Sequence, residues 1–294
     1  MPDFGDAERR ILSYFVKGRS FLYKGQEYSV VEADKPTCSS GEPKTDIYVL
    51  ADSASGQEEI KISYKKENAD FLENKIGSER AEQIFGPNWS DIIATSTKDI
   101  RDKFLERALI YKTAFRRTCE GAITLGWKFE LVNKLGGELS GRMNLSQQQV
   151  YDVYAGTNLG LDKRDAYVHD RAVKNSGIAN NILMTNQVNS IQDIIDKMIP
   201  IKDYICVHPD IYFACKALNY RTFEQKYDGN RPLAVQVNWE IENRKLTPHL
   251  LFDAPLKRNG LEMANQLLHC MKRLHILTTD DINSSNADMR SVHE

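Results

Sequence analysis

An alternating stretch from Glu59 to Lys65 constrains the fold more than any other segment of the chain. Its polar positions are Glu59, Lys61, Ser63 and Lys65, and its apolar positions are Ile60, Ile62 and Tyr64. Side chains in a strand alternate between two faces, so this pattern predicts a strand with one charged face. Ile47 to Leu50 is β-branched and aromatic, and Ser53 to Gly56 separates the two stretches as a turn. The region from Gly41 to Lys66 therefore predicts a β-hairpin.

Three charged residues of this hairpin suggest chemistry. Asp46 lies on the first strand, and Glu59 follows it by 13 positions on the second. If the two strands pair, their carboxylates can converge, and two such oxygens suit a hydrated cation such as Mg²⁺. Lys61 would stand beside that cation, where an ammonium can polarise water or stabilise charge on a phosphoryl oxygen. Glu58 points to the opposite face, so Glu59 is the preferred ligand.

The segments Pro43-Lys44-Thr45-Asp46 and Glu59-Ile60-Lys61 resemble the PD-(D/E)xK nuclease superfamily, which includes the type II restriction endonucleases. The resemblance implies an α/β core with a central mixed sheet flanked by helices. It also implies Mg²⁺-dependent phosphodiester hydrolysis, with Asp46 and Glu59 as metal ligands and Lys61 near the attacking water. Thr45 replaces the proline that the family places directly before the aspartate. A solvated, salt-bridged hairpin face would present the same three residues.

The order of the predicted elements agrees with the core of that family. A helix is expected first, then two strands, the hairpin, a second helix and a further strand. Their expected ranges are Ala7 to Lys17, Arg19 to Tyr23, Glu27 to Ala33, the hairpin itself, Asn68 to Phe85 and Ile92 to Thr95. Glu8, in the first helix, is a candidate accessory acid, although an acid in a first turn also favours the helix dipole. Glu32 is a second candidate.

Two segments are candidates for DNA contact. Lys98 to Glu120 has helical periodicity, and its part up to Arg117 carries seven basic against three acidic residues, a balance of +4. Such a face could lie along phosphates, and a solvated amphipathic helix would look the same. Amides crowd Asn175 to Gln192 and could read adenine, although amides also favour turns and caps. The candidate DNA-binding residues are Lys65, Lys66, Arg101, Lys112, Arg116, Arg117, Asn180, Asn181, Asn186 and Gln187.

Composition sets broad limits on the class of protein. The 294 residues carry a net charge of −2, which does not favour a simple electrostatic DNA binder, although a nuclease needs only a basic cleft. Five cysteines without a C-x-x-C pair argue against a disulfide framework or a zinc site. No apolar run approaches the roughly 20 residues that cross a bilayer, and no signal region is apparent, so a cytoplasmic protein without membrane contact is expected.

The second half of the chain predicts a hairpin over Pro232 to Phe252, a helix over Gly260 to Ile276, and a loose polar tail from Thr278. A strand is expected at Tyr204 to Val207, and a helix capped by Ser146 ends near Gly156. Without a repeat or a linker, residues 1–294 are expected to form one domain. Residues 1–125 would be the nuclease core, and residues 126–294 would supply DNA recognition and dimerisation.

The sequence therefore predicts a hydrolase, a Mg²⁺-dependent endonuclease that cuts double-stranded DNA at a specific sequence, as in a restriction system. A palindromic site would require a homodimer. A repair, recombination or homing nuclease of the same superfamily is one alternative. A non-catalytic DNA-binding or assembly protein is the alternative from another class.

Overall fold

The chain forms two compact units, each built from segments that are distant in sequence. The computed structural model describes residues 4–39, 41–67, 69, 71–74 and 76–294. Unit 1 consists of Met1–Ala69, Gln83–Gly86 and Leu145–Asp210, and unit 2 consists of Asp70–Glu82, Pro87–Asn144 and Ile211–Glu294. Both units combine helices with β-sheet, and the sheets mix parallel and antiparallel pairs. The prediction of a mixed α/β protein is therefore confirmed.

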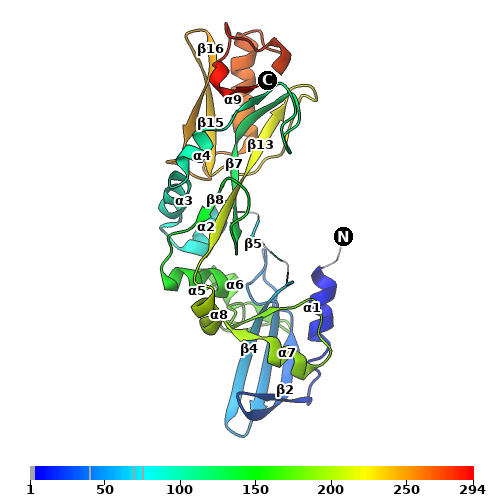
Figure 1. Cartoon of the computed structure of the whole chain (residues 1–294). Helices are drawn as coiled ribbons and strands as arrows, with labels where there is room; N and C mark the ends of the chain where they lie inside the picture. The colour runs from blue at the N-terminus through cyan, green and yellow to red at the C-terminus, as the bar shows by residue number, and fades with distance from the viewer. Residues whose placement is uncertain (1–3, 40, 68, 70, 75) are drawn as a thin grey trace. The chain divides into compact units, whose positions relative to one another are not determined.

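Unit 1 is organised around a six-stranded sheet with the order β1-β2-β3-β4-β11-β12 (Figure 1). Its strands are β1 (Ser20–Tyr23), β2 (Gln26–Asp34), β3 (Ile47–Ser53), β4 (Gly56–Lys65), β11 (Asn181–Met184) and β12 (Ile199–Pro200). Strands β1 to β4 form an antiparallel meander. Strand β11 then pairs with β4 in parallel, and β12 pairs with β11 antiparallel. The predicted hairpin is confirmed as β3 and β4.

One face of this sheet carries the hydrophobic core of unit 1. Apolar side chains of β3 and β4 pack with α1 (Phe4–Leu12) and α7 (Ile191–Lys197). The fully buried members of the hairpin are Ile47, Val49, Ala51, Ile60 and Ile62. These positions alternate along each strand, so the opposite face of the hairpin carries the polar set. The amphipathic pattern in the sequence therefore predicted the core face correctly.

Helices complete unit 1. They are α5 (Gln147–Ala155), α6 (Leu161–Arg164), α7 and α8 (Ile201–Val207), and a short ribbon is formed by β9 (Tyr167–Val168) and β10 (Arg171–Ala172). The predicted Ser146 cap is confirmed: its side chain accepts a hydrogen bond from the Gln149 N–H in a capping box, and Gly156 ends the helix with φ 79°. The strand predicted at Tyr204 to Val207 is wrong, because this segment is α8. Tyr204 packs edge-on against Tyr154 at 5.2 Å.

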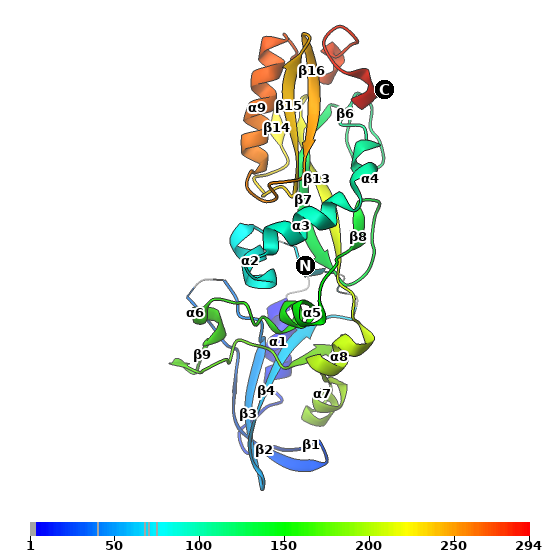
Figure 2. The same ribbon diagram turned by 90° about the vertical axis from the view of Figure 1, so that its left-hand side faces the viewer.

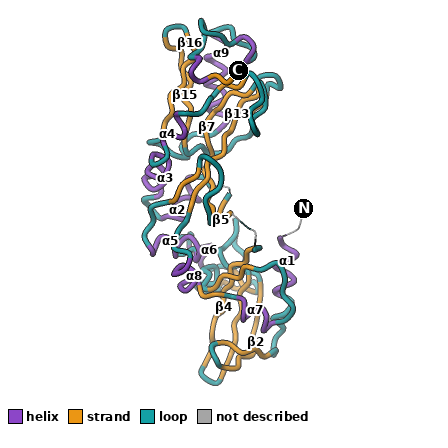
Figure 3. Tube along the Cα trace, viewed as in Figure 1, coloured by secondary structure: helices purple, strands orange, loops and turns teal. Residues whose placement is uncertain are grey.

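Unit 2 is built on a sheet whose main path runs β14-β13-β7-β15-β16. Its strands are β5 (Phe71–Glu73), β6 (Ile110–Tyr111), β7 (Ala122–Val132), β8 (Ser140–Arg142), β13 (Tyr212–Arg221), β14 (Lys226–Tyr227), β15 (Val235–Glu242), β16 (Lys245–Leu251) and β17 (Val292–His293). The long strands β7 and β13 run side by side (Figure 3). The predicted hairpin in the second half is confirmed as β15 and β16, which turn at Asn243 and Arg244 with positive φ.

A buried aromatic core stabilises unit 2. The helix predicted over Gly260 to Ile276 is confirmed as α9 (Gly260–Arg273), which lies along β15 (Figure 2). Trp127 and Trp239 are almost completely buried, and the Trp239 indole donates a hydrogen bond to the Thr124 carbonyl at 2.9 Å. A buried indole N–H needs such a partner. The remaining helical elements of unit 2 are α3 (Trp89–Lys98), α4 (Arg101–Leu105), η1 (Thr279–Asp281) and η2 (Met289–Ser291).

Helix predictions between residues 68 and 120 are partly wrong. Helix α2 (Ser78–Phe85) covers only the end of the predicted Asn68 helix, and Asn68 itself lies outside the described residues. The strand predicted at Ile92 to Thr95 is helical and belongs to α3. The predicted long basic helix is reduced to α4, because the apolar run that follows it becomes β6 and pairs with β7. Tertiary pairing therefore outweighs the local helical period.

The C-terminal segment is packed and not loose. Strand β17 pairs in parallel with β6, and Thr279 and Ala287 are fully buried. Although the segment is mostly polar, its few buried side chains, Thr279, Ile282 and Ala287, pack it against the rest of unit 2. No helix among the described residues is long and apolar enough to cross a membrane.

The predicted single domain with a boundary near residue 125 does not match the structure. Strand β11, which completes the sheet of unit 1 beside β4, comes from Asn181–Met184. Unit 1 thus extends to Asp210 and is interrupted by segments of unit 2. This insertion cannot be seen in the sequence, because the pairing of β4 with β11 joins segments more than 100 residues apart.

Candidate functional site

The register of β3 and β4 separates the two predicted metal ligands. Leu50 lies opposite Glu59, and Tyr48 lies opposite Lys61. Asp46 precedes β3, and its N–H donates to the Ile62 carbonyl at 2.9 Å. It is therefore displaced by four residues from the level of Glu59, roughly 13 Å at about 3.3 Å per residue. The prediction that Asp46 and Glu59 converge on one cation is wrong, although both lie on the charged face.

Glu59 belongs to a cluster in which both carboxylates, Glu59 and Glu32, have partners. The Tyr48 hydroxyl donates to Glu59 Oε1 at 2.8 Å, and Lys61 Nζ donates to Glu59 Oε2 at 3.2 Å. Glu32, the second accessory candidate, forms an ion pair with Arg171. Burial, together with the nearby carboxylates of Glu59 and Glu32, raises the pKa of Tyr48. The structure thus brings Glu59 and Lys61 together as predicted, and it assigns them to an ion-paired network.

Asp46 forms a different cluster at the start of β3. Its Oδ2 accepts a hydrogen bond from the Tyr64 N–H at 2.7 Å, so the carboxylate continues the β-ladder beyond the strand. Desolvation by burial raises the pKa of Asp46 from 3.8 to about 6. The Lys65 ammonium and the Tyr64 N–H oppose this rise, whereas the Glu8 carboxylate adds to it. Asp46 is therefore a desolvated acid with another acid and a lysine in electrostatic range.

Three strand ends and one helix assemble this cluster. Strand β2 ends near Lys35, β3 begins after Asp46, and β4 ends at Lys65. Helix α1 contributes Glu8, whose Oε2 accepts from Lys35 Nζ at 2.5 Å. Glu8 and Asp46 both raise the pKa of Lys35, although burial opposes them. The sequence predicted Glu8 as an accessory acid, and the structure places it near Asp46 and not near Glu59. We call Glu8, Lys35, Asp46 and Lys65 the Asp46 cluster.

The candidate DNA-binding amides have structural roles in part. The Asn180 side chain accepts from the Lys61 N–H and donates to the Glu59 carbonyl, both at 2.8 Å, so it extends the sheet beside β4. Asn181 is buried and donates to Asn180. Both amides are therefore committed within the protein, contrary to the prediction that they read bases. Asn186, which donates to Glu67, and Gln187 are exposed in unit 1.

The basic candidates outside unit 1 lie on different elements and have different partners. Arg101 lies over the Phe252 ring at 5.8 Å, and Lys112 donates to the Ile282 carbonyl at 3.2 Å. Arg116 and Arg117 are exposed on the loop between β6 and β7. These residues do not form one helical face as predicted. Lys66, which follows β4, is partly buried in unit 1.

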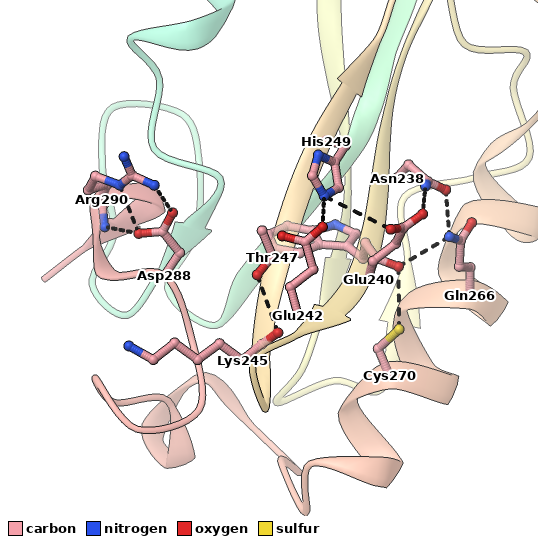
Figure 4. Close-up of polar contacts among 11 residues, drawn as sticks. Asn238, Glu240, Glu242, Lys245, Thr247, His249, Gln266, Cys270, Asp288 and Arg290 are labelled. Atoms are coloured by element: carbon pink, nitrogen blue, oxygen red, sulfur yellow. Dashed lines mark hydrogen bonds and ion pairs between the residues drawn. The ribbon is translucent and has the colours of Figure 1, made fainter.

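Unit 2 contains a separate group of possible metal ligands that the sequence analysis missed (Figure 4). Donor atoms of Glu240, Glu242 and His249 lie within 4.8 Å of one another, the only such group of three among the described His, Cys, Asp and Glu residues. His249 Nε2 is 3.0 Å from Glu242 Oε1 and 4.0 Å from Glu240 Oε2. Imidazole with carboxylates suits a transition metal such as Zn²⁺ or Mn²⁺. Glu240 and Glu242 are exposed, His249 is half-buried, and the imidazole already pairs with both carboxylates.

The register of the two predicted hairpins could have revealed both groupings that the sequence analysis missed: Asp46 with Lys65, and His249 with Glu240. Counting seven residues from the Ser53–Gly56 pair places Asp46 opposite Ser63, two residues from Lys65. On β15 and β16, counting four residues from the Glu242–Lys245 pair places His249 opposite Asn238, beside Glu240 on one face. Register therefore carries information that motif spacing omits.

No protein-family model, no curated protein and no solved structure matches this chain.

Proposed function

We propose that unit 1 is a Mg²⁺-dependent nuclease unit that hydrolyses a phosphodiester of double-stranded DNA at a specific sequence, with the Asp46 cluster as its catalytic centre. One observation carries the proposal: the desolvated Asp46 carboxylate lies in electrostatic range of Glu8 and Lys65. A group with a strongly shifted pKa beside specific charges is a candidate for a functional site. The chain order of α1, the meander, the hairpin and a further parallel strand also supports a resemblance to the nuclease superfamily.

The donor set of the Asp46 cluster fits a hard divalent cation. Asp46 and Glu8 offer carboxylate oxygens, which are the ligands that Mg²⁺ prefers in proteins. The repulsion between Glu8 and Asp46, which raises the pKa of Asp46, would be relieved by a cation held by both. Bound there, Mg²⁺ would lower the pKa of a coordinated water and stabilise charge on the phosphate.

The remaining residues prepare the cluster for that role. The Tyr64 N–H holds the Asp46 carboxylate in place, and the Lys65 ammonium favours its ionised form. Lys65 also lies on the charged face, where it can stabilise a phosphoryl oxygen. Lys35 neutralises Glu8, so a divalent cation must compete with that ammonium. Glu59 and Lys61 would act as positioning residues, because Asn180 joins their backbone to the edge of β11.

A direct test incubates the purified protein with plasmid and phage DNA in Mg²⁺ or in EDTA. We expect discrete, reproducible fragments in Mg²⁺ and intact DNA in EDTA. The Asp46→Asn protein, purified in the same way, should leave the DNA intact and so excludes a contaminating nuclease. A smear of fragments would favour a repair or recombination enzyme over a restriction enzyme. Intact DNA from several genomes, with folded wild-type protein, would contradict the proposal.

A further inference from the structure

A cavity of about 650 Å³ lies in unit 2. Its lining includes Lys103, Arg107, Tyr111, Phe115, Arg116 and His293. The volume is in the range of pockets that hold small organic ligands. All of these residues belong to unit 2, so the cavity is distinct from the Asp46 cluster in unit 1. The combination of aromatic and cationic side chains indicates the chemistry of its ligand.

Aromatic rings form one wall of the cavity. The Phe115 ring lies 4.7 Å from the His293 ring, and the Tyr111 ring lies 6.0 Å from the same His293 ring. Phe115 is 38% exposed, so part of its ring is accessible to a ligand. The Arg116 guanidinium lies 5.1 Å from the centre of the same ring. Such a wall can stack a flat heterocycle, and base stacking of this kind is sequence-tolerant.

Two guanidinium groups converge on a single carboxylate in the same cavity. Arg107 Nη1 is 2.7 Å from Glu138 Oε2, and Arg116 contacts Glu138 Oε1. The Arg107 guanidinium also lies close enough to the Tyr111 hydroxyl to oppose the rise in the pKa of Tyr111 that burial causes. Glu138 thus lies where a phosphate would bind between two arginines, since guanidinium groups bind carboxylate and phosphate with the same geometry. Glu138 is 53% exposed, so these ion pairs are weak and can be exchanged.

The charge of the lining also favours an anion. Lys103, Arg107 and Arg116 contribute three positive charges against two negative charges from Glu106 and Glu138, a net of +1. Displacement of the Glu138 side chain would leave +2 in the cavity. A phosphate monoester, which carries nearly two negative charges, would then be neutralised.

We propose that this cavity binds a nucleotide, with its base against Phe115 and His293 and its phosphate between Arg107 and Arg116 in place of Glu138. The nucleotide can be free or part of a DNA strand, because both present a base and a phosphate. The inference goes beyond the proposed nuclease function and does not depend on the metal centre of unit 1.

The test measures binding in EDTA by isothermal titration calorimetry, so that metal chemistry in unit 1 does not contribute. The probes are deoxyadenosine monophosphate, deoxyadenosine, inorganic phosphate and a short single-stranded oligodeoxynucleotide. We expect the monophosphate or the oligonucleotide to bind more tightly than deoxyadenosine or inorganic phosphate. Binding of the monophosphate identifies a site for free nucleotides, whereas binding of the oligonucleotide alone identifies a site for a nucleotide within a strand.

Four substitutions make the test specific. Arg116→Gln should weaken binding by on the order of tenfold, because a charged hydrogen bond to phosphate is lost. Arg117→Gln is the matched control: the neighbouring arginine is exposed, does not line the cavity and should leave binding unchanged. Glu138→Gln should tighten binding, because it frees both guanidinium groups. Phe115→Leu should reduce the affinity for the nucleotide and not that for inorganic phosphate.

Three results would overturn the proposal. The first is an absence of binding by both the monophosphate and the oligonucleotide. The second is an equal loss for Arg116→Gln and Arg117→Gln, which would indicate diffuse attraction to a basic loop. The third is weaker binding by Glu138→Gln in a protein with an unchanged circular dichroism spectrum.

Discussion

Two groups of carboxylates in this protein differ in solvent exposure, and this difference distinguishes a surface ion-paired group from a candidate catalytic centre. Glu240, Glu242 and His249 in unit 2 offer three donor atoms within 4.8 Å, but their side chains are 50%, 48% and 41% exposed. The Asp46 cluster in unit 1 offers two carboxylates, and burial raises the pKa of Asp46 to about 6. Exposed charges are stabilised by water, so their grouping requires no ligand. A desolvated carboxylate beside another acid gains much more from a cation.

The largest expected effect is on the rate of DNA cleavage, when one carboxylate of each group is replaced by its amide. Asp46→Asn should reduce Mg²⁺-dependent cleavage at least about a hundredfold, because it removes an anionic ligand from the proposed centre. Glu242→Gln makes the same chemical change in the exposed group and should cleave at the wild-type rate. Initial rates on a plasmid that the wild type linearises provide the measurement. Equal rates for Asp46→Asn and wild type would remove Asp46 from the chemistry.

Two lysines of β4 sharpen the location of the centre within unit 1. Lys65→Met should lower the cleavage rate by about a hundredfold, because it removes a cation beside Asp46. Lys61→Met removes the ammonium that pairs with Glu59 at 3.2 Å, toward the other end of the hairpin from Asp46, and should retain the rate within about fivefold. Single-turnover rates at saturating DNA would compare the two variants. A severe loss for Lys61→Met alone would favour the Glu59 end of the hairpin.

The pH dependence of stability tests the burial of Asp46. Its pKa is higher in the folded state, about 6, than its ordinary value of 3.8. The folded protein therefore holds the proton more tightly, and this contribution to stability is full below pH 3.8 and is lost as the pH rises through about 6. Asp46→Asn has no carboxylate to ionise and so avoids this loss. The difference in the free energy of unfolding between Asp46→Asn and the wild type should therefore shift in favour of the variant by up to about 3 kcal/mol between pH 3.8 and pH 8.

Urea unfolding at several pH values would measure this difference. Glu242→Gln, which makes the analogous chemical change at an exposed side chain, is the control. An Asp46→Asn difference that stays constant from pH 4 to pH 8 would mean that the Asp46 carboxylate is well solvated.

The smallest effect is expected at the exposed group of unit 2. His249→Ala should change the free energy of unfolding by less than about 1 kcal/mol, because it removes only exposed contacts with Glu242 and Glu240. DNA cleavage by this variant should equal that of the wild type. Urea melts at pH 7 and the plasmid assay provide both measurements. Loss of cleavage in folded His249→Ala would move the metal centre to unit 2.

Local patterns predicted much of the fold, and long-range pairing explains most of the errors. The alternation of β4 and the turn at Ser53 to Gly56 were sufficient to predict the hairpin and its core face. The predicted helix over Lys98 to Glu120 failed because Ile110 pairs with Ile123 and Val292. The unit boundaries were missed because the partner of β4 is β11, which lies beyond an inserted part of unit 2.

The candidate site was predicted in part. Asp46 and Glu8 were both named from the sequence, and they lie in electrostatic range. The motif spacing suggested that Asp46 lies near Glu59, whereas the strand register places Asp46 opposite Ser63, two residues from Lys65. Lys35 could not be predicted, because it reaches Glu8 only through the packing of α1 at the end of the sheet. The basic segment was recognised, but it was predicted as a helix, and the packing of its Phe115 against His293 depends on the pairing of β17 with β6.

The most direct measurement compares the DNA cleavage of two single variants, Glu8→Gln and Glu59→Gln. Both variants remove one negative charge near the same hairpin and differ only in the end that they affect. With both proteins folded, the account predicts that Mg²⁺-dependent cleavage of plasmid DNA is lost in Glu8→Gln and retained in Glu59→Gln. Retained cleavage in Glu8→Gln with loss in Glu59→Gln would contradict a catalytic centre at the Asp46 cluster.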